Sequence, residues 1–269
     1  MLLKNNFLTF SSFCPALQNL SLSDCFIDCA SISSDSLKHL SIIDCRFNLR
    51  FCTHVCTLNL ISLCIEGSWN KTPVLEAMPS LVDGIIRVIN QSTDCSTYKH
   101  YNYGDCGFGE CENCYGVHDY NNCVLLEGLS EAKSLALVGN METFVFTRDL
   151  KWCPTFSMLK TLLLNEYWCV GPGFKPLACI LKHTPVLEKL ILQVLSKRRK
   201  HDVEMKGRYI SGQKSAEISQ HLEIVEVKCK EVGRMVVKVL KFFGTFGICK
   251  LTCDTFHIFL YSEFCYRTH

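Results

Sequence analysis

The hydrophobic positions along the chain follow a short template that is neither helical nor simply alternating. In residues 17–25, LQNLSLSDC, leucines stand at positions 17, 20 and 22 and a cysteine follows at position 25. An amphipathic helix would place apolar residues at i, i+3, i+4 and i+7, and a half-buried strand would alternate strictly. The stretch fits neither pattern alone, so its meaning depends on whether it recurs.

The template recurs along most of the chain, at intervals of about 20 to 35 residues in most cases. Its copies share an apolar residue at the first position and apolar residues three and five positions later, with one glycine among them. The copies are Leu17, Leu20 and Leu22; Leu37, Leu40 and Ile42; Leu60, Leu63 and Ile65; Leu81, Gly84 and Ile86; Ala132, Leu135 and Leu137; Leu159, Leu162 and Leu164; Leu187, Leu190 and Leu192; and Leu222, Val225 and Val227.

This L-x-x-L-x-L pattern predicts a short strand in each copy. Its last two apolar positions alternate and give the strand one buried face, while the first lies in the turn that leads in. Small polar or thiol side chains such as Cys25, Cys45 and Asn140 follow the strand, and we expect them to satisfy backbone amides at the bend. The pattern is typical of an α/β leucine-rich-repeat solenoid, an irregular horseshoe in which each repeat covers its neighbour. The alternative is a set of ordinary amphipathic strands in an α/β domain.

Two helices are predicted between or after the strands. In 176–190, Pro176 marks a helix start, Leu177, Ile180 and Leu181 form an apolar stripe, and Thr184 with the following proline ends the helix. Residues 231–246, EVGRMVVKVLKFFGTF, have apolar residues along one side and follow the last predicted strand. Because the final repeat of a solenoid needs a cover, we expect a C-terminal capping helix here; the alternative is an ordinary helix on the convex side.

The composition predicts an ordered chain without a strong electrostatic field. Hydrophobic residues make up 48% and charged residues 20% of the 269 positions, and the formal net charge is +2. A nearly balanced charge does not favour nucleic acid or a membrane surface as partner. The one dense basic run, KRRKH at 197–201, is typical of a solvated loop. No apolar stretch approaches the 18 residues of a membrane span. We therefore expect neither nucleic acid nor a membrane as partner.

The 19 cysteines favour a reducing compartment. Their number is odd, the first residues show no clear secretory signal, and many of them stand within or at the end of apolar runs, where a thiol behaves as a small hydrophobic group. Disulfide-rich domains of this cysteine count are secreted, whereas cytosolic thiols stay reduced. We therefore expect the cytoplasm or the nucleus.

A cysteine-rich stretch at 103–123, YGDCGFGECENCYGVHDYNNC, contains a possible zinc site. Its candidate ligands are Cys106, Cys111, Cys114, His118 and Cys123. They suffice for tetrahedral zinc, but only one C-x-x-C pair has the usual spacing, and four glycines interrupt the stretch. We interpret it as a Cys/Gly-rich insertion at about 95–122 without metal, and keep a zinc-stabilised binding protein as an alternative.

No set of residues indicates catalysis. Ser, His and Asp occur without a G-x-S-x-G turn, and the G-x-G at 107–109 has no preceding strand or following helix. We expect no catalytic residues, no bound cofactor and no enzymatic activity.

Several segments resemble a known family. Residues 185–232, with PVLEKLIL and HLEIVEVKC, residues 159–169, LKTLLLNEYWC, and residues 122–137, NCVLLEGLSEAKSLAL, resemble the C-terminal part of grass F-box/leucine-rich-repeat proteins. The order of VLEKL, HLEIVEVKC and an apolar helix is similar to the FBD-type module that ends many of these proteins. The resemblance covers about residues 13–248 and divides the chain into repeats at 13–194, an FBD-like module at 195–248 and an unassigned tail at 249–269.

The resemblance implies the substrate-recognition part of a ubiquitin-ligase receptor, which binds a protein target on its concave face. Family members begin with an F-box of about 40 residues that binds a Skp-type adaptor, whereas here the first repeat follows Met1 within about twenty residues. We therefore expect adaptor binding only where an F-box is supplied. The alternative is a truncated or decoy binding protein with no ligase role.

Overall fold

The computed structural model describes residues 8–9, 16–48, 50–68, 71–90, 124–140, 143, 145–169, 174–194, 219–244, 246, 248 and 250–255. These residues form a mixed α/β structure dominated by parallel strands, with few and short helices. None of the helices in this part of the chain is long and apolar enough to span a membrane.

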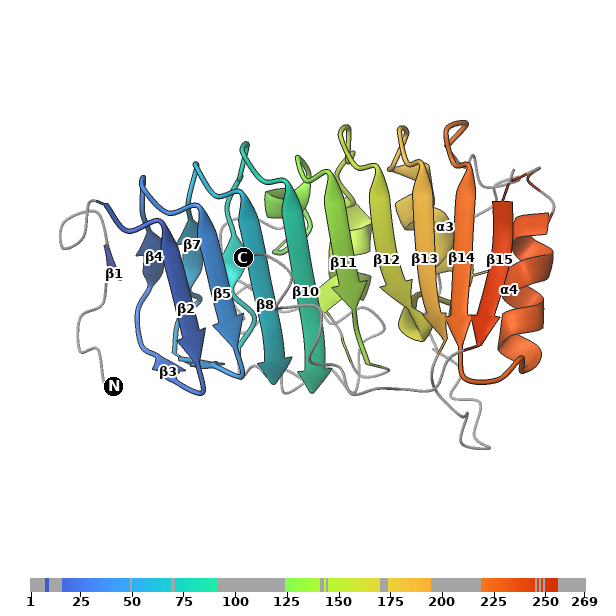
Figure 1. Cartoon of the computed structure of the whole chain (residues 1–269). Coiled ribbons are helices and arrows are strands. Elements are labelled where there is room, and N and C mark those ends of the chain that lie inside the picture. Colours follow the sequence, from blue (N-terminus) through green and yellow to red (C-terminus); the bar gives the residue numbers. More distant parts are fainter. Residues whose placement is uncertain are drawn as a thin grey trace.

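Nine strands of the described residues form one sheet, which we call the large sheet. Its strands are β2 (Asn19–Ser23), β5 (His39–Ile43), β8 (Ser62–Ser68), β10 (Asp83–Asn90), β11 (Ser134–Val138), β12 (Thr161–Asn165), β13 (Lys189–Val194), β14 (Ile224–Cys229) and β15 (Lys250–Thr255). They lie side by side in chain order, each parallel to the next (Figure 1). The sheet is open, with β2 and β15 at its two edges.

The template residues occupy equivalent positions in the eight strands of the large sheet from β2 to β14, and the pairing registers align them across the sheet, where β15 adds Leu251 and Cys253. The middle positions form one row, Leu20, Leu40, Leu63, Gly84, Leu135, Leu162, Leu190, Val225 and Leu251, and the last positions form the next row, Leu22, Ile42, Ile65, Ile86, Leu137, Leu164, Leu192, Val227 and Cys253. Away from the two edge strands these residues are buried, so the predicted inward-facing set is confirmed there. Leu20 and Leu22 are partly exposed because β2 has a neighbour on one side only.

The glycine in the fourth copy of the template has a packing reason. A Cβ atom on Gly84 would lie 2.6 Å from Cδ2 of Leu135 and 3.4 Å from Cδ2 of Leu129. These leucines therefore fill the space that a leucine at position 84 would need. The fourth copy of the template is therefore a strand of the same kind, in which the side chains of neighbouring residues occupy the space left by Gly84.

Tight turns follow the first strands. Asp24 and Asp44 directly follow β2 and β5 with φ of 49° and 50°, the left-handed conformation that aspartate tolerates. Each donates its amide to the next strand, Asp24 to the carbonyl of Ile43 and Asp44 to that of Glu66. The next residues, Cys25 and Cys45, then place their sulfur atoms 3.2 Å apart.

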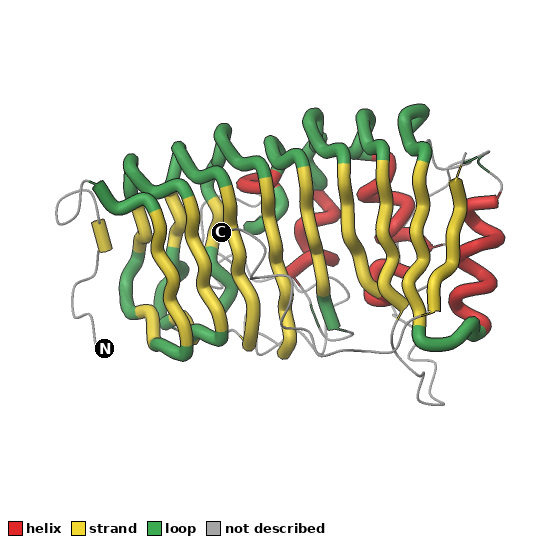
Figure 2. Tube along the Cα trace, viewed as in Figure 1, coloured by secondary structure: helices red, strands yellow, loops and turns green. Residues whose placement is uncertain are grey.

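The connections between these strands differ in the two halves of the chain (Figure 2). In the first half they contain short strands. Strands β4 (Ser31–Ser33), β7 (His54–Cys56) and β9 (Val74–Leu75) form a second sheet with β1 (Leu8–Thr9), which precedes β2, and β3 (Phe26–Ile27) pairs with β6 (Arg46–Phe47). In the second half they contain helices: η3 (Glu127–Leu129), α2 (Val145–Asp149), η4 (Leu150–Trp152), η5 (Glu166–Cys169), α3 (Lys175–Lys182) and α4 (Arg234–Gly244). The helix predicted from residue 176 is α3, and its stripe of Leu177, Ile180 and Leu181 is buried as expected.

The predicted capping helix is wrong in its position in the fold. Strand β15 extends the large sheet beyond β14, so residues 250–255 of the unassigned tail belong to the sheet. Helix α4 is the connection between these two parallel strands, and its buried side chains are Val236, Val239 and Phe243. The ring of Phe242 lies 5.4 Å from that of Phe174, the residue before α3. The amphipathic pattern predicted the helix correctly, but it could not reveal that another strand follows.

Candidate protein-interaction surface

The large sheet has one face that the connections do not cover. Side chains alternate along each strand, and the short strands β4 and β7 and helix α3 lie behind the sheet in the view of Figure 1, while α4 stands beside β15 at its end. The residues between the buried rows therefore form an outward surface, which we call the open face. Three positions of each strand contribute to it, for example Ser134, Ala136 and Val138 of β11, all partly exposed.

An apolar row crosses the centre of the open face. Ile85, Ala136, Leu163 and Ile191 stand on four neighbouring strands, β10 to β13, and each is the register partner of the next. All are partly exposed. Since neighbouring strands lie about 4.8 Å apart, the row extends over roughly 14 Å. Outward positions of a one-sided sheet are normally polar, so these residues are not explained by the core.

The same row is polar towards the first strands. Ser21, Ser41 and Cys64 are its members on β2, β5 and β8, and the register joins Cys64 to Ile85. Small side chains of this kind offer little apolar contact area. The apolar part of the open face is therefore confined to the middle strands.

Charges border the apolar row on the other side. Glu226 is the register partner of Ile191, and Nζ of Lys189 lies 2.9 Å from its carboxylate. The hydrogen bond from Lys189 and the positive charges of Lys189, Lys228 and Lys250 lower the pKa of Glu226, against the opposing effect of partial burial. The carboxylate thus stays ionised at neutral pH and balances part of this basic patch.

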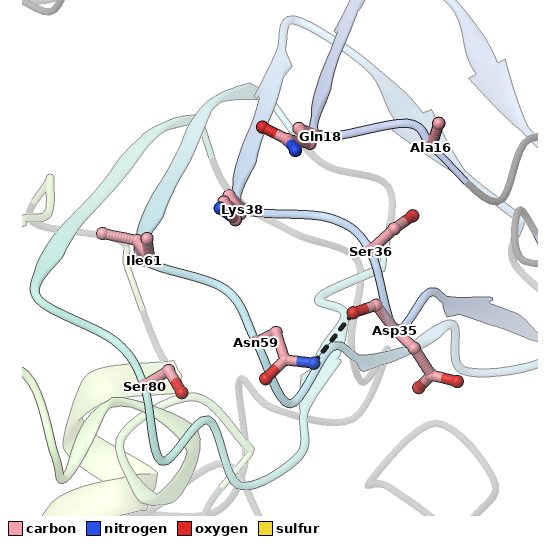
Figure 3. Close-up of a pocket in the computed structure, with 8 residues that line it drawn as sticks. All are labelled: Ala16, Gln18, Asp35, Ser36, Lys38, Asn59, Ile61 and Ser80. Carbon is pink, nitrogen blue, oxygen red and sulfur yellow. Dashed lines mark hydrogen bonds between the residues drawn. The ribbon is translucent and has the colours of Figure 1, made fainter.

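A cavity of about 420 Å³ lies at the turns that lead into β2, β5, β8 and β10 (Figure 3). Its lining residues come from successive turns and are mostly polar: Ala16, Gln18, Asp35, Ser36, Lys38, Asn59, Ile61 and Ser80. The Asn59 amide donates to the backbone carbonyl of Asp35 at 2.8 Å and fixes two of these turns together. The lining contains one acidic side chain, Asp35, and one basic side chain, Lys38, together with small polar residues.

Burial keeps several thiols of the described residues neutral. Burial is the main cause that raises the pKa of both Cys45 and Cys169 to about 12, and that of Cys229 to about 11. These values agree with the interpretation of such cysteines as small hydrophobic residues. Cys179 differs: its pKa is lowered by a hydrogen bond from Cys153 and by the charge of Lys182, although burial opposes both.

The sequence-based zinc candidates, Cys106, Cys111, Cys114, His118 and Cys123, lie outside the described residues. Within the described part of the chain a different cluster appears, formed by Cys153, Cys179 and His183. Sequence reasoning missed it because Cys153 precedes β12 and the other two residues follow it. The C-x-x-x-H spacing of Cys179 and His183 on one helix side was its only local signal.

Comparisons with known proteins identify no relative. No protein-family model matches the chain, and neither a curated protein nor a solved structure matches it.

Proposed function

We propose that this chain is a leucine-rich-repeat solenoid that binds a protein target on its open face, as the target-recognition part of an F-box-type ubiquitin-ligase receptor. The observation that carries the binding function is the apolar row of Ile85, Ala136, Leu163 and Ile191. Its partly exposed side chains are removed from water when an apolar surface covers them, which favours association by about 25 cal/mol per Å² before ordering costs.

The repeat architecture is supported by the template and by its place in each strand. The first apolar position of each copy lies just before a strand, as with Leu37 and Leu159, which are fully buried. The second and third positions form the aligned rows beneath the sheet. Strands that add in chain order, each covering its predecessor's apolar residues, are what a leucine-rich-repeat chain requires.

A protein fits the open face better than a small molecule or a nucleic acid. Small-molecule sites are concave pockets with converging polar groups, whereas the apolar row runs across four neighbouring strands. Nucleic-acid surfaces are strongly basic, whereas Lys189 is paired with Glu226 here. An apolar centre bordered by charged groups is the usual anatomy of a protein interface.

Affinity capture with matched variants tests this function. The full chain, the Leu163→Asp variant and the Met158→Asp variant are used as baits in extract from the native tissue. Leu163 belongs to the apolar row, and Met158, 45% exposed, lies in the turn before β12. We expect to capture a protein that binds to the full chain and to the Met158→Asp variant but not to the Leu163→Asp variant. The same protein, once purified, should bind to the same two baits and not to Leu163→Asp. Equal retention by both variants contradicts binding at the open face.

The ligase role is tested separately. In the proposed receptor, the chain acts in the cytoplasm or nucleus, and its target is ubiquitinated by the complex to which it belongs. Purified Skp-type adaptor is offered to the chain alone and to the chain with an F-box fused at its N-terminus. Binding by the fusion together with ubiquitination of the captured target supports the receptor. Target binding without adaptor binding by either form supports the second candidate, a binding protein with no ligase role.

A further inference from the structure

Three metal-binding side chains meet among the connections that lie behind the large sheet. Cys153 directly follows η4, Cys179 lies in α3, and His183 follows the last residue of α3. One ligand atom from each residue lies within 4.8 Å of the other two, and all three residues are partly exposed. We propose that Cys153, Cys179 and His183 bind one zinc ion, with a water molecule as the fourth ligand.

The distances are close to those of a tetrahedral zinc site. With zinc–sulfur bonds of about 2.3 Å and zinc–nitrogen bonds of about 2.0 Å, ligand atoms in such a site lie roughly 3.5–3.8 Å apart. The ligand atoms of the cluster lie within 4.8 Å of one another, so they need to approach by at most about 1 Å, which small side-chain rotations supply. Thiolate and imidazole ligands select zinc over magnesium and calcium, and two thiolates neutralise the charge of the ion.

A hydrogen bond at the C-terminal end of α3 fixes the tautomer of the His183 imidazole. Its Nδ1 lies 2.8 Å from the backbone carbonyl oxygen of Cys179. Because a carbonyl only accepts, Nδ1 carries the proton, and Nε2 is left with the lone pair that a metal needs. A hydrogen bond of this kind from the second ring nitrogen is the usual support of a zinc-binding histidine.

The backbone around the cluster is fixed by hydrogen bonds. The His183 carbonyl accepts the amide of Phe156 at 2.8 Å, which ties the segment after Cys153 to the end of α3. The His183 amide in turn donates to the carbonyl of Ile180 at 3.0 Å. The backbone that carries the ligands is therefore held in place without the metal, and this lowers the entropy cost of ordering the ligands when a metal binds.

The proton balance of zinc binding is defined by the two thiols. Without metal, the Cys179 thiol lies 3.7 Å from the carbonyl oxygen of Leu150, and the Cys153 thiol lies 3.7 Å from that of Pro154. Zinc binding forms two zinc–sulfur bonds and one zinc–nitrogen bond, and releases the two thiol protons to solvent. Affinity therefore rises with pH in the range where the thiols are still protonated.

Cobalt(II) substitution tests the site in the full chain. The protein is purified under reducing conditions, stripped with a chelator and titrated with Co²⁺, then with Zn²⁺. We expect the absorption of tetrahedral cobalt with thiolate ligands, followed by its loss as zinc displaces cobalt. Cys153→Ser, Cys179→Ser and His183→Gln should each weaken zinc binding at least about tenfold. The matched control, Cys111→Ser with Cys114→Ser, removes the C-x-x-C pair of the other cysteine-rich stretch and should leave the absorption unchanged.

Other outcomes overturn the proposal. Absorption that is lost in the control and kept in the three variants would assign the metal to residues 103–123. Absence of thiolate–cobalt absorption in the full chain excludes the site. A disulfide between Cys153 and Cys179 that persists in the presence of a reducing agent excludes it as well. If a variant fails to fold, mass-spectrometric mapping of alkylation in the unmutated chain replaces it. Zinc should protect Cys153 and Cys179 from alkylation, and equal labelling with and without zinc contradicts the proposal.

Discussion

The carboxylate of Asp149, the last residue of α2, accepts a hydrogen bond at 2.7 Å from the backbone amide of Leu125, which lies just before η3. The same carboxylate also accepts hydrogen bonds from the backbone amides of Val124 and Leu126, and the shortest nitrogen–oxygen distance is 3.0 Å for each. Asp149 is fully buried at the end of α2, and it holds the start of the segment that leads through η3 into β11. A buried carboxylate of this kind is tolerated because three N–H donors replace its water.

Asp149→Ala should therefore destabilise the fold by about 3 kcal/mol, because three buried amides lose their acceptor. Asp149→Asn keeps one side-chain oxygen and should cost less. The free energy of unfolding is measured by urea titration followed by circular dichroism. Glu131→Ala, at an exposed position in the same connection, is the control and should change it by less than about 0.5 kcal/mol. Equal effects of the alanine variants at 149 and 131 would contradict the anchoring role.

Neighbouring residues on β13 test the two faces of the large sheet. Leu190 is fully buried, whereas Ile191 belongs to the open face. Leu190→Asp should destabilise by about 4 kcal/mol or more, because it places an unpaired carboxylate in the apolar interior. Ile191→Asp makes the same kind of change at a partly exposed position and should cost about 1 kcal/mol or less. Thermal melts of the two variants check the register, and a Leu190→Asp variant that melts like the parent would refute it.

The sequence predicted the strands well because each copy of the template carries its own signal. Leu187, Leu190 and Leu192, for example, define β13 without any knowledge of the rest of the fold. Strand β15 was missed because its inward residues, Leu251 and Cys253, include a cysteine and lie in the tail that the resemblance left unassigned. The position of a strand in a sheet depends on the strands with which it pairs, and the local periodicity of the sequence carries no information about these partners.

The surface residues were less predictable for the same reason. Leu163 and Ile191 were readable as outward positions, but only the register shows that they form one row with Ile85. The short strands β4 and β7 replace helices in the first half, and segments of three residues are too short for a periodic signal. Contacts between distant elements, such as that of Asp149 with Leu125, leave no pattern in the sequence at all.

Alkaline conditions should weaken the fold through Cys45. Its pKa is raised from 9.0 to about 12, mainly by burial, so the folded chain keeps a proton that the unfolded chain loses above pH 9. The free energy of unfolding should therefore fall as pH rises from 9 towards 12, by at most about 1.4 kcal/mol per pH unit from this group. Below pH 9 the thiol is neutral in both states and contributes no slope.

The measurement for Cys45 is urea unfolding at a series of pH values between neutral and alkaline. Cys45→Ala should show a smaller loss of stability with rising pH than the unmutated chain. Leu40→Ala, which also removes atoms from a buried position, keeps the thiol and should retain the full slope. Parallel curves for all three proteins would show that Cys45 does not titrate differently in the two states.

The last strands should be needed for solubility. Strand β14 pairs with β15 from Ile224 to Cys229, and α4, which connects the two strands, buries Val236, Val239 and Phe243. A chain cut after Cys229 exposes both the backbone edge of β14 and the apolar surface that α4 covers. An unprotected edge of this kind pairs with other chains, so we expect aggregation during size-exclusion chromatography. A chain cut after Thr255 keeps α4 and β15 and should elute as a single species. A 1–229 fragment that is monodisperse and unfolds cooperatively would show that the large sheet does not need this end.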